Sequence, residues 1–123
     1  MTIPGWLTKS SGDAEFSTSE RCYITELMNS DASPGVSVAV ARVEPGVSTQ
    51  LHALCGVTES YIVKSGNGLM QVGHESHPVE AGDQVTIAAD QPQRITNNGD
   101  SDLLFYCICT PRFTADCYIN LEE

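Results

Sequence analysis

Three polar side chains in the middle of the chain have the types and order of a ligand-binding or metal site. His52 and Glu59 lie close together in the sequence, and Gln93 follows much further on. Imidazole nitrogen and carboxylate oxygen suit first-row divalent metals, whereas an amide oxygen is a poorer donor. The same residues could also work without a metal, because burial raises the pKa of a carboxyl and lets it move protons near neutral pH. We therefore keep both a metal site and an acid–base site around Glu59 as hypotheses.

Two further side chains lie close to Glu59 in the sequence. Tyr61 comes two positions later, on the same face of a strand, so we predict that it supplies a pocket hydroxyl and acts with Glu59 as a catalytic residue. Cys55 lies between His52 and Glu59. It could be a replacement thiolate ligand, a nucleophile, or a cysteine without chemistry, and its role stays open.

Another cysteine pair and a histidine pair have chemical alternatives of their own. Cys107 and Cys109 alternate along one face of an apolar segment, so they either pack in the core or line a pocket. His74 and His77 could form a two-histidine metal pair, but Gly73 and Pro78 flank them. We expect a loop with exposed histidines there.

Short strands separated by turn-forming residues must position these side chains. Alternating apolar residues and Gly/Pro-rich breaks are typical of an antiparallel sandwich or small barrel. We expect strands near residues 21–27, 35–43, 49–54, 59–64, 69–72, 84–87, 93–96 and 103–109. A short helix is allowed near 114–118, and residues 1–20 are left open as an arm or an irregular first strand.

Glycines frame the candidate residues in two motifs. The first, over 46–66, runs from Gly46 through His52 and Glu59 to Gly66; the second, over 82–97, contains Gln93. In these motifs the chain resembles the cupin superfamily, and in particular the small single-domain bacterial cupins compared with mannose-6-phosphate isomerase. The resemblance implies one all-β domain over residues 1–123, a double-stranded β-helix or jelly-roll barrel, with 1–20 as its N-terminal arm.

The resemblance also implies a metal site inside the barrel, in a degenerate form. Family members bind a divalent metal through two closely spaced histidines, a glutamate and a later histidine. Here Leu54 stands at the second histidine position and Gln93 at the third. His52, Glu59 and Gln93 are then the expected ligands of Fe, Mn, Ni or Zn, with lowered affinity or with no metal at all.

The same resemblance sets the functional expectation. It favours a small-molecule-binding cupin that works as a metal-dependent enzyme, with isomerase, oxygenase or lyase chemistry on a small polar metabolite. The alternative is a non-catalytic, metal-free protein that binds or senses a metabolite, and whether the chain is an enzyme stays open. A homodimer is expected by analogy with cupins whose first strand crosses to a partner.

Composition limits the partners. Six Lys and Arg against sixteen Asp and Glu give a net charge of −10, which would repel nucleic acid and anionic lipid surfaces. The start of the chain lacks the basic end and long apolar stretch of a signal peptide, and no apolar run approaches the ~20 residues of a membrane span. We expect a cytoplasmic protein with no membrane or nucleic-acid partner and with its five cysteines reduced.

Overall fold

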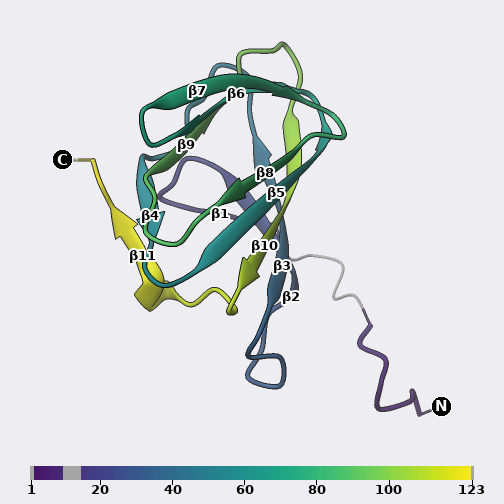
Figure 1. Cartoon of the computed structure of the whole chain (residues 1–123). Helices are drawn as coiled ribbons and strands as arrows, with labels where there is room; N and C mark the ends of the chain where they lie inside the picture. The colour runs from purple at the N-terminus through teal and green to yellow at the C-terminus, as the bar shows by residue number, and fades with distance from the viewer. Residues whose placement is uncertain (1, 10–14, 123) are drawn as a thin grey trace.

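Two antiparallel sheets stacked face to face form the fold of this computed structural model, which describes residues 2–9 and 15–122 (Figure 1). The larger sheet has the order β1-β2-β3-β10-β5-β8 and the smaller one β11-β4-β9-β6-β7. The strands are β1 (Glu15–Ser17), β2 (Tyr23–Met28), β3 (Ser37–Val43), β4 (His52–Leu54), β5 (Thr58–Ser65), β6 (Asn67–Val72), β7 (Glu75–Glu80), β8 (Gln84–Ile87), β9 (Gln93–Thr96), β10 (Leu103–Thr110) and β11 (Tyr118–Asn120). The expected all-β fold is confirmed.

The core lies between the sheets because alternate residues of the central strands point inward and most of these are apolar. In β10 the inward residues Leu103 and Phe105 are almost fully buried, and in β9 Ile95 is fully buried. Each such side chain contributes roughly 1.5–3 kcal/mol when removed from water. Towards the other end of β10 the inward positions hold cysteines, and there the core gives way to a cavity.

The glycine and asparagine at the ends of the two motifs have structural reasons. Gly66 has a φ of +90°, and a Cβ there would lie 2.7 Å from the carbonyl oxygen of Asp102. Asn97 is fully buried and donates through Nδ2 to the carbonyl oxygens of Val43 (2.9 Å) and Ser101 (2.8 Å). These residues hold the turns that connect the strands, so their types follow from the fold and not from ligand binding.

Most of the expected strands are present, with two errors at the edges. The expected loop around His74 and His77 is wrong in part, because β7 includes His77. Among the described strands, β6 alone pairs with β7, so the polar residues of β7 stay exposed and Pro78 is tolerated at the sheet edge. β11 was not expected either, since only three residues form it after the short 3-10 turn at Ala115–Cys117.

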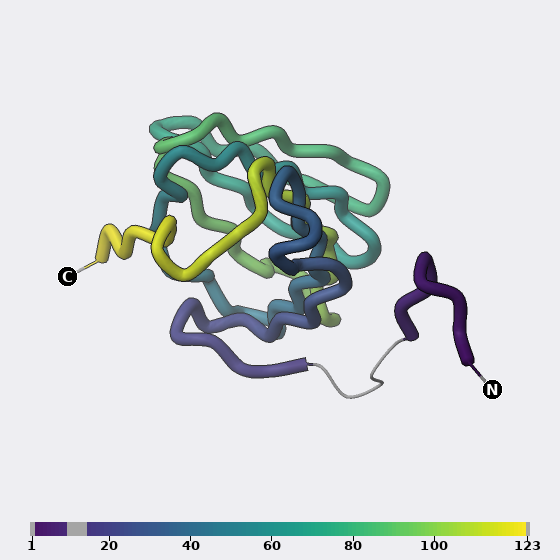
Figure 2. The backbone as a smooth tube through the Cα atoms, turned by 90° about the horizontal axis from the view of Figure 1, so that it is seen from below, coloured from purple at the N-terminus to yellow at the C-terminus, as the bar shows by residue number. Residues whose placement is uncertain are grey.

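The strand expected over 49–54 is shorter in the structure and begins at His52. Residues 2–9 run apart from the barrel, and the side chain of Trp6 is 84% exposed (Figures 1 and 2). Within 2–9 and 15–122, no helix is long and apolar enough to span a bilayer. The expectation for the arm over residues 10–14 falls outside the described residues.

Candidate functional site

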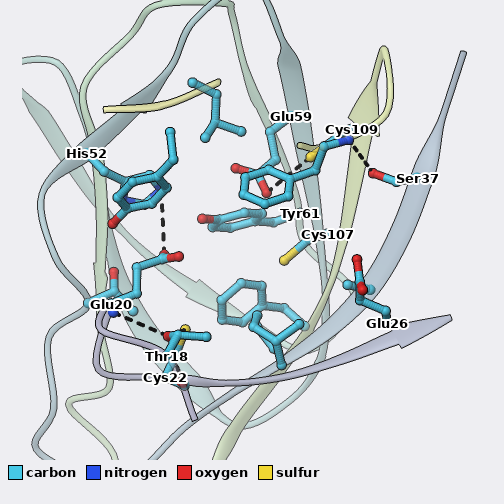
Figure 3. A pocket seen from close by; sticks show the side chains of 18 of the residues that line it. Thr18, Glu20, Cys22, Glu26, Ser37, His52, Glu59, Tyr61, Cys107 and Cys109 are labelled. Atoms are coloured by element: carbon cyan, nitrogen blue, oxygen red, sulfur yellow. Dashed lines mark hydrogen bonds and ion pairs between the residues drawn. The ribbon is translucent and has the colours of Figure 1, made fainter. Parts of the chain in front are cut away.

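A cavity of about 140 Å³ opens between the β1–β2 hairpin and the ends of β3, β5 and β10 (Figure 3). Its wall is mostly apolar and aromatic, with a few polar groups pointing inward. An apolar cavity of ~150 Å³ is known to hold a benzene molecule, so this one has room for a ligand of roughly six non-hydrogen atoms. The polar lining residues are Thr18, Glu20, Glu26, Ser37, Thr49, His52, Glu59 and Tyr61.

His52 presents one ring nitrogen to a carboxylate of the cavity wall. Its Nδ1 lies 2.7 Å from the carbonyl oxygen of Gln50 and therefore donates a hydrogen bond to it. Its Nε2 lies 3.6 Å from Oε2 of Glu20, and the ring stacks on Tyr118 at 4.9 Å between centroids. The Nδ1 bond fixes the ring orientation and leaves Nε2 to accept or donate a proton in the cavity.

Glu20 is brought to His52 by the tight turn between β1 and β2. The turn closes with hydrogen bonds from Thr18 to the carbonyl oxygen of Cys22, and the Gln50 N–H donates to the Glu20 carbonyl oxygen at 2.9 Å. Burial raises the pKa of Glu20, and the nearby His52 opposes this rise. No sequence pattern indicates Glu20, because residues 1–20 have no clear periodicity and Glu20 lies 32 positions before His52.

Glu59 is the most unusual group in the cavity. Its side chain enters from β5, the residue is only 7% exposed, and Oε2 accepts a weak hydrogen bond from Cys109 Sγ at 3.6 Å. Oε1 is buried, and no described residue makes a hydrogen bond to it. Burial raises the pKa of Glu59 to about 7; the Gln93 side chain opposes the rise, and the negative charge of Glu20 adds to it. Both protonation states are therefore available near neutral pH.

Gln93 is tied to Tyr61 behind the cavity wall. It is opposite His52 in the register of β4 and β9, and it is 1% exposed. The Tyr61 hydroxyl donates to Gln93 Oε1 at 2.6 Å, and burial keeps the pKa of Tyr61 well above its usual range. Tyr61 therefore lines the cavity as a neutral phenol, while the Gln93 amide oxygen is already engaged.

The cysteines separate into two groups. Cys107 and Cys109 line the cavity, as one of the two alternatives anticipated, and burial raises the pKa of both thiols, so neither is a ready thiolate. Cys55 lies exposed in the turn after β4 and is absent from the cavity wall. All five cysteines of the chain are free thiols.

The residues present do not fit a divalent metal. Catalytic metal sites take about three protein ligands, whereas in the described part of the chain no three His, Cys, Asp or Glu side chains are grouped to hold an ion. Among the described residues, Glu20 is the one carboxylate within ion-pair distance of His52. Leu54 fills the second histidine position, and Gln93 directs its oxygen to Tyr61.

Comparison with known proteins identifies related chains and folds. The family described as the cupin domain matches residues 39–109. The uncharacterized protein MJ1618 of Methanocaldococcus jannaschii is 32% identical over 101 residues, which are 80% of this chain and 81% of the relative. Both matches include the strands that carry His52, Glu59 and Gln93.

Solved structures with the same fold include two proteins of different function. A predicted oxalate decarboxylase from Thermotoga maritima superposes with a TM-score of 0.76 and 23% identity, over 85% of this chain and 98% of its own. Pac13 from Streptomyces, described as a nucleoside dehydratase, superposes with a TM-score of 0.77 and 19% identity, over 94% and 92% of the two chains. At these identities the likeness concerns the fold.

Proposed function

The chain belongs to the cupin domain family. From this premise we propose that its barrel binds a small polar metabolite and, without a metal, moves a proton from one atom of that metabolite to another. The observation that carries the proposal is Glu59. This carboxyl is almost fully buried, one of its oxygens has no hydrogen bond from a described residue, and its pKa is near neutrality. Such a group destabilises the folded protein, and a bound ligand that donates to it would offset that loss.

Two acid–base groups enter the cavity from different strands. Glu59, from β5, accepts a proton when ionised and donates one when neutral. His52, from β4, holds its Nδ1 against the Gln50 carbonyl oxygen and presents Nε2 to the cavity, 3.6 Å from Glu20 Oε2. One group can take a proton from the ligand while the other returns a proton at a second atom, as isomerisation and elimination require.

The rest of the wall supports proton transfer by limiting water. The two cavity cysteines and Phe105 add weakly polar surface to the cavity that Glu59 enters, and the Tyr61 hydroxyl donates to Gln93. A low-polarity wall strengthens the hydrogen bonds between the ligand and the few polar groups. Two proteins with this fold are described as a predicted oxalate decarboxylase and a nucleoside dehydratase, and oxalate and nucleosides are small molecules.

The mostly apolar wall favours one second candidate, a non-catalytic protein that binds or senses the same metabolite. Both candidates require binding in the cavity, and only the first requires proton exchange. We therefore separate binding from chemistry in the test.

The test uses a panel of amines, amino acids and hydroxy acids of about the size of benzene, in the presence of EDTA. Compounds that raise the midpoint of thermal unfolding are incubated with the protein in D2O, and proton NMR follows solvent deuterium entering the ligand. We expect stabilisation that survives EDTA, with deuterium incorporation by the wild type and by Glu44→Gln, whose site is exposed and outside the cavity. Glu59→Gln should bind but exchange far more slowly.

The outcomes distinguish the alternatives. Binding without exchange in the wild type would favour the sensing protein. Stabilisation that disappears with EDTA and returns with added metal would contradict the metal-independent proposal.

A further inference from the structure

Apart from the His52 imidazole, the acidic and basic side chains that face the cavity are carboxyl groups. Its lining contains the carboxylates of Glu20, Glu26 and Glu59 together with the imidazole of His52. No Lys or Arg is among the described residues that line it. Three of the four arginines pair with carboxylates elsewhere, and Arg94 donates to Gln71 Oε1. The three ion-paired arginines are Arg21 with Glu122, Arg42 with Glu15 and Asp102, and Arg112 with Asp31. An anionic ligand would therefore meet uncompensated negative charge in a low-dielectric site.

The polar atoms open to a ligand are mainly acceptors. Glu59 Oε1 is buried, with no hydrogen bond from any described residue, so it calls for a donor. Oε2 of Glu20 lies 3.6 Å from His52 Nε2, which is too long for a hydrogen bond, so it has an ion-pair neighbour but no close donor from His52. The Tyr61 hydroxyl uses its single proton on Gln93 and keeps only lone pairs for another partner. A ligand that fits these groups must bring N–H or O–H donors, or a positive charge.

Aromatic rings form much of the remaining wall. Five of them line the cavity: Phe16, Tyr61, Phe105, Phe113 and Tyr118. Tyr61 and Phe105 pack against each other with centroids 4.4 Å apart, and Tyr61 lies two residues after Glu59 on the same face of β5. The face of an aromatic ring attracts a cation, and the attraction grows when the cation is removed from water. Carboxylates among aromatic faces are the combination that recognises organic ammonium groups.

From these contacts we infer that the cavity takes a small organic cation, a primary amine or a quaternary ammonium of about the size of benzene. The inference rests on the proposed function and specifies the chemical class of its ligand. The ammonium lies between Glu59 and Glu20, against the aromatic wall. Its charge also favours the ionised form of Glu59, which offsets the cost of burying that carboxylate.

The test compares probes that match in shape and differ in charge. One set is isoamylamine, isoamyl alcohol and isovalerate; a second pair is choline and its neutral isostere with a tert-butyl group in place of trimethylammonium. Each is titrated into the full-length protein by calorimetry at low ionic strength, in EDTA, at about pH 8, above the pKa of Glu59. We expect each cation to bind at least about tenfold more tightly than its neutral match, and isovalerate to bind weakest.

Two variants then test whether Glu59 causes the preference for cationic over neutral probes. Glu59→Gln keeps the shape and removes the charge, so it should reduce the preference for the cation about tenfold. Glu44→Gln removes an exposed charge outside the cavity and should leave the preference unchanged. If neutral probes bind as tightly as cations, or if isovalerate binds best, the cation inference is wrong while the proposed function stands. If no probe binds, the inference is also wrong, and the metabolite panel above decides the proposed function independently.

Discussion

Replacing Glu59 by Gln should make the protein more stable at neutral and alkaline pH. Burial raises the pKa of Glu59 from 4.5 to about 7 on folding, so the folded state holds the proton more tightly than the unfolded chain. Ionising the carboxyl therefore destabilises the folded state. The penalty is absent below about pH 4, grows between the two pKa values and is complete above about pH 7.

The magnitude follows from the difference between these pKa values. At about 1.4 kcal/mol for each pH unit, the wild type should lose roughly 3 kcal/mol relative to Glu59→Gln across this range. The assay is urea unfolding of both proteins between about pH 4 and pH 8, with the difference in free energy plotted against pH. Because Gln has no titration here, the slope of that difference isolates the carboxyl, whatever constant offset the amide introduces.

Two parallel stability curves would refute the reasoning. They would mean that the carboxyl has a similar pKa in the folded and unfolded chains, and hence that water or an unrecognised partner solvates Glu59 in the cavity. A difference of the opposite sign would mean that the ionised carboxylate is stabilised by the fold.

Three further substitutions test the framework of the site by urea unfolding. Tyr61→Phe leaves the buried oxygen of Gln93 without its donor and should cost about 1–3 kcal/mol; a neutral effect would mean that another group satisfies the amide. Asn97→Ala removes the two hydrogen bonds from Asn97 Nδ2 to backbone carbonyl oxygens and should lower the free energy of unfolding by about 3 kcal/mol. A smaller loss would mean that water takes the place of the amide. Gly66→Ala should cost well over the ~1–2 kcal/mol of a left-handed backbone, because its Cβ would lie 2.7 Å from a backbone oxygen. Gly46→Ala, with φ +81° and open space, is its control, and equal losses would contradict the clash.

The all-β fold could be predicted because its signals are local. Alternation of apolar residues marks the central strands, and glycines at positive φ mark several turns, as at Gly46 and Gly82. The edge strands of the sheets were harder to predict. Among the described strands, β7 has a partner on one side, and it carries exposed polar residues. Its sequence, with a proline inside, has the composition of a loop.

The candidate site could be predicted only in part, for a related reason. His52 and Glu59 lie within framed motifs, and Tyr61 shares a strand face with Glu59, so all three could be placed near one cavity. Glu20 could not be found, because its approach to His52 depends on how the β1–β2 hairpin folds over the barrel. Gln93 stands at a ligand position of the motif, but its direction depends on the Tyr61 hydroxyl on the other sheet.

Metal content tests the central claim most directly. The protein is purified without chelator, loaded anaerobically with Fe(II), Mn(II), Ni(II) and Zn(II) in turn, desalted, and analysed by mass spectrometry beside His52→Ala. We predict substoichiometric metal that is the same in both proteins, because the described part of the chain groups no three His, Cys, Asp or Glu side chains around an ion. Stoichiometric metal in the wild type that is lost in His52→Ala would contradict a cavity that works without a metal.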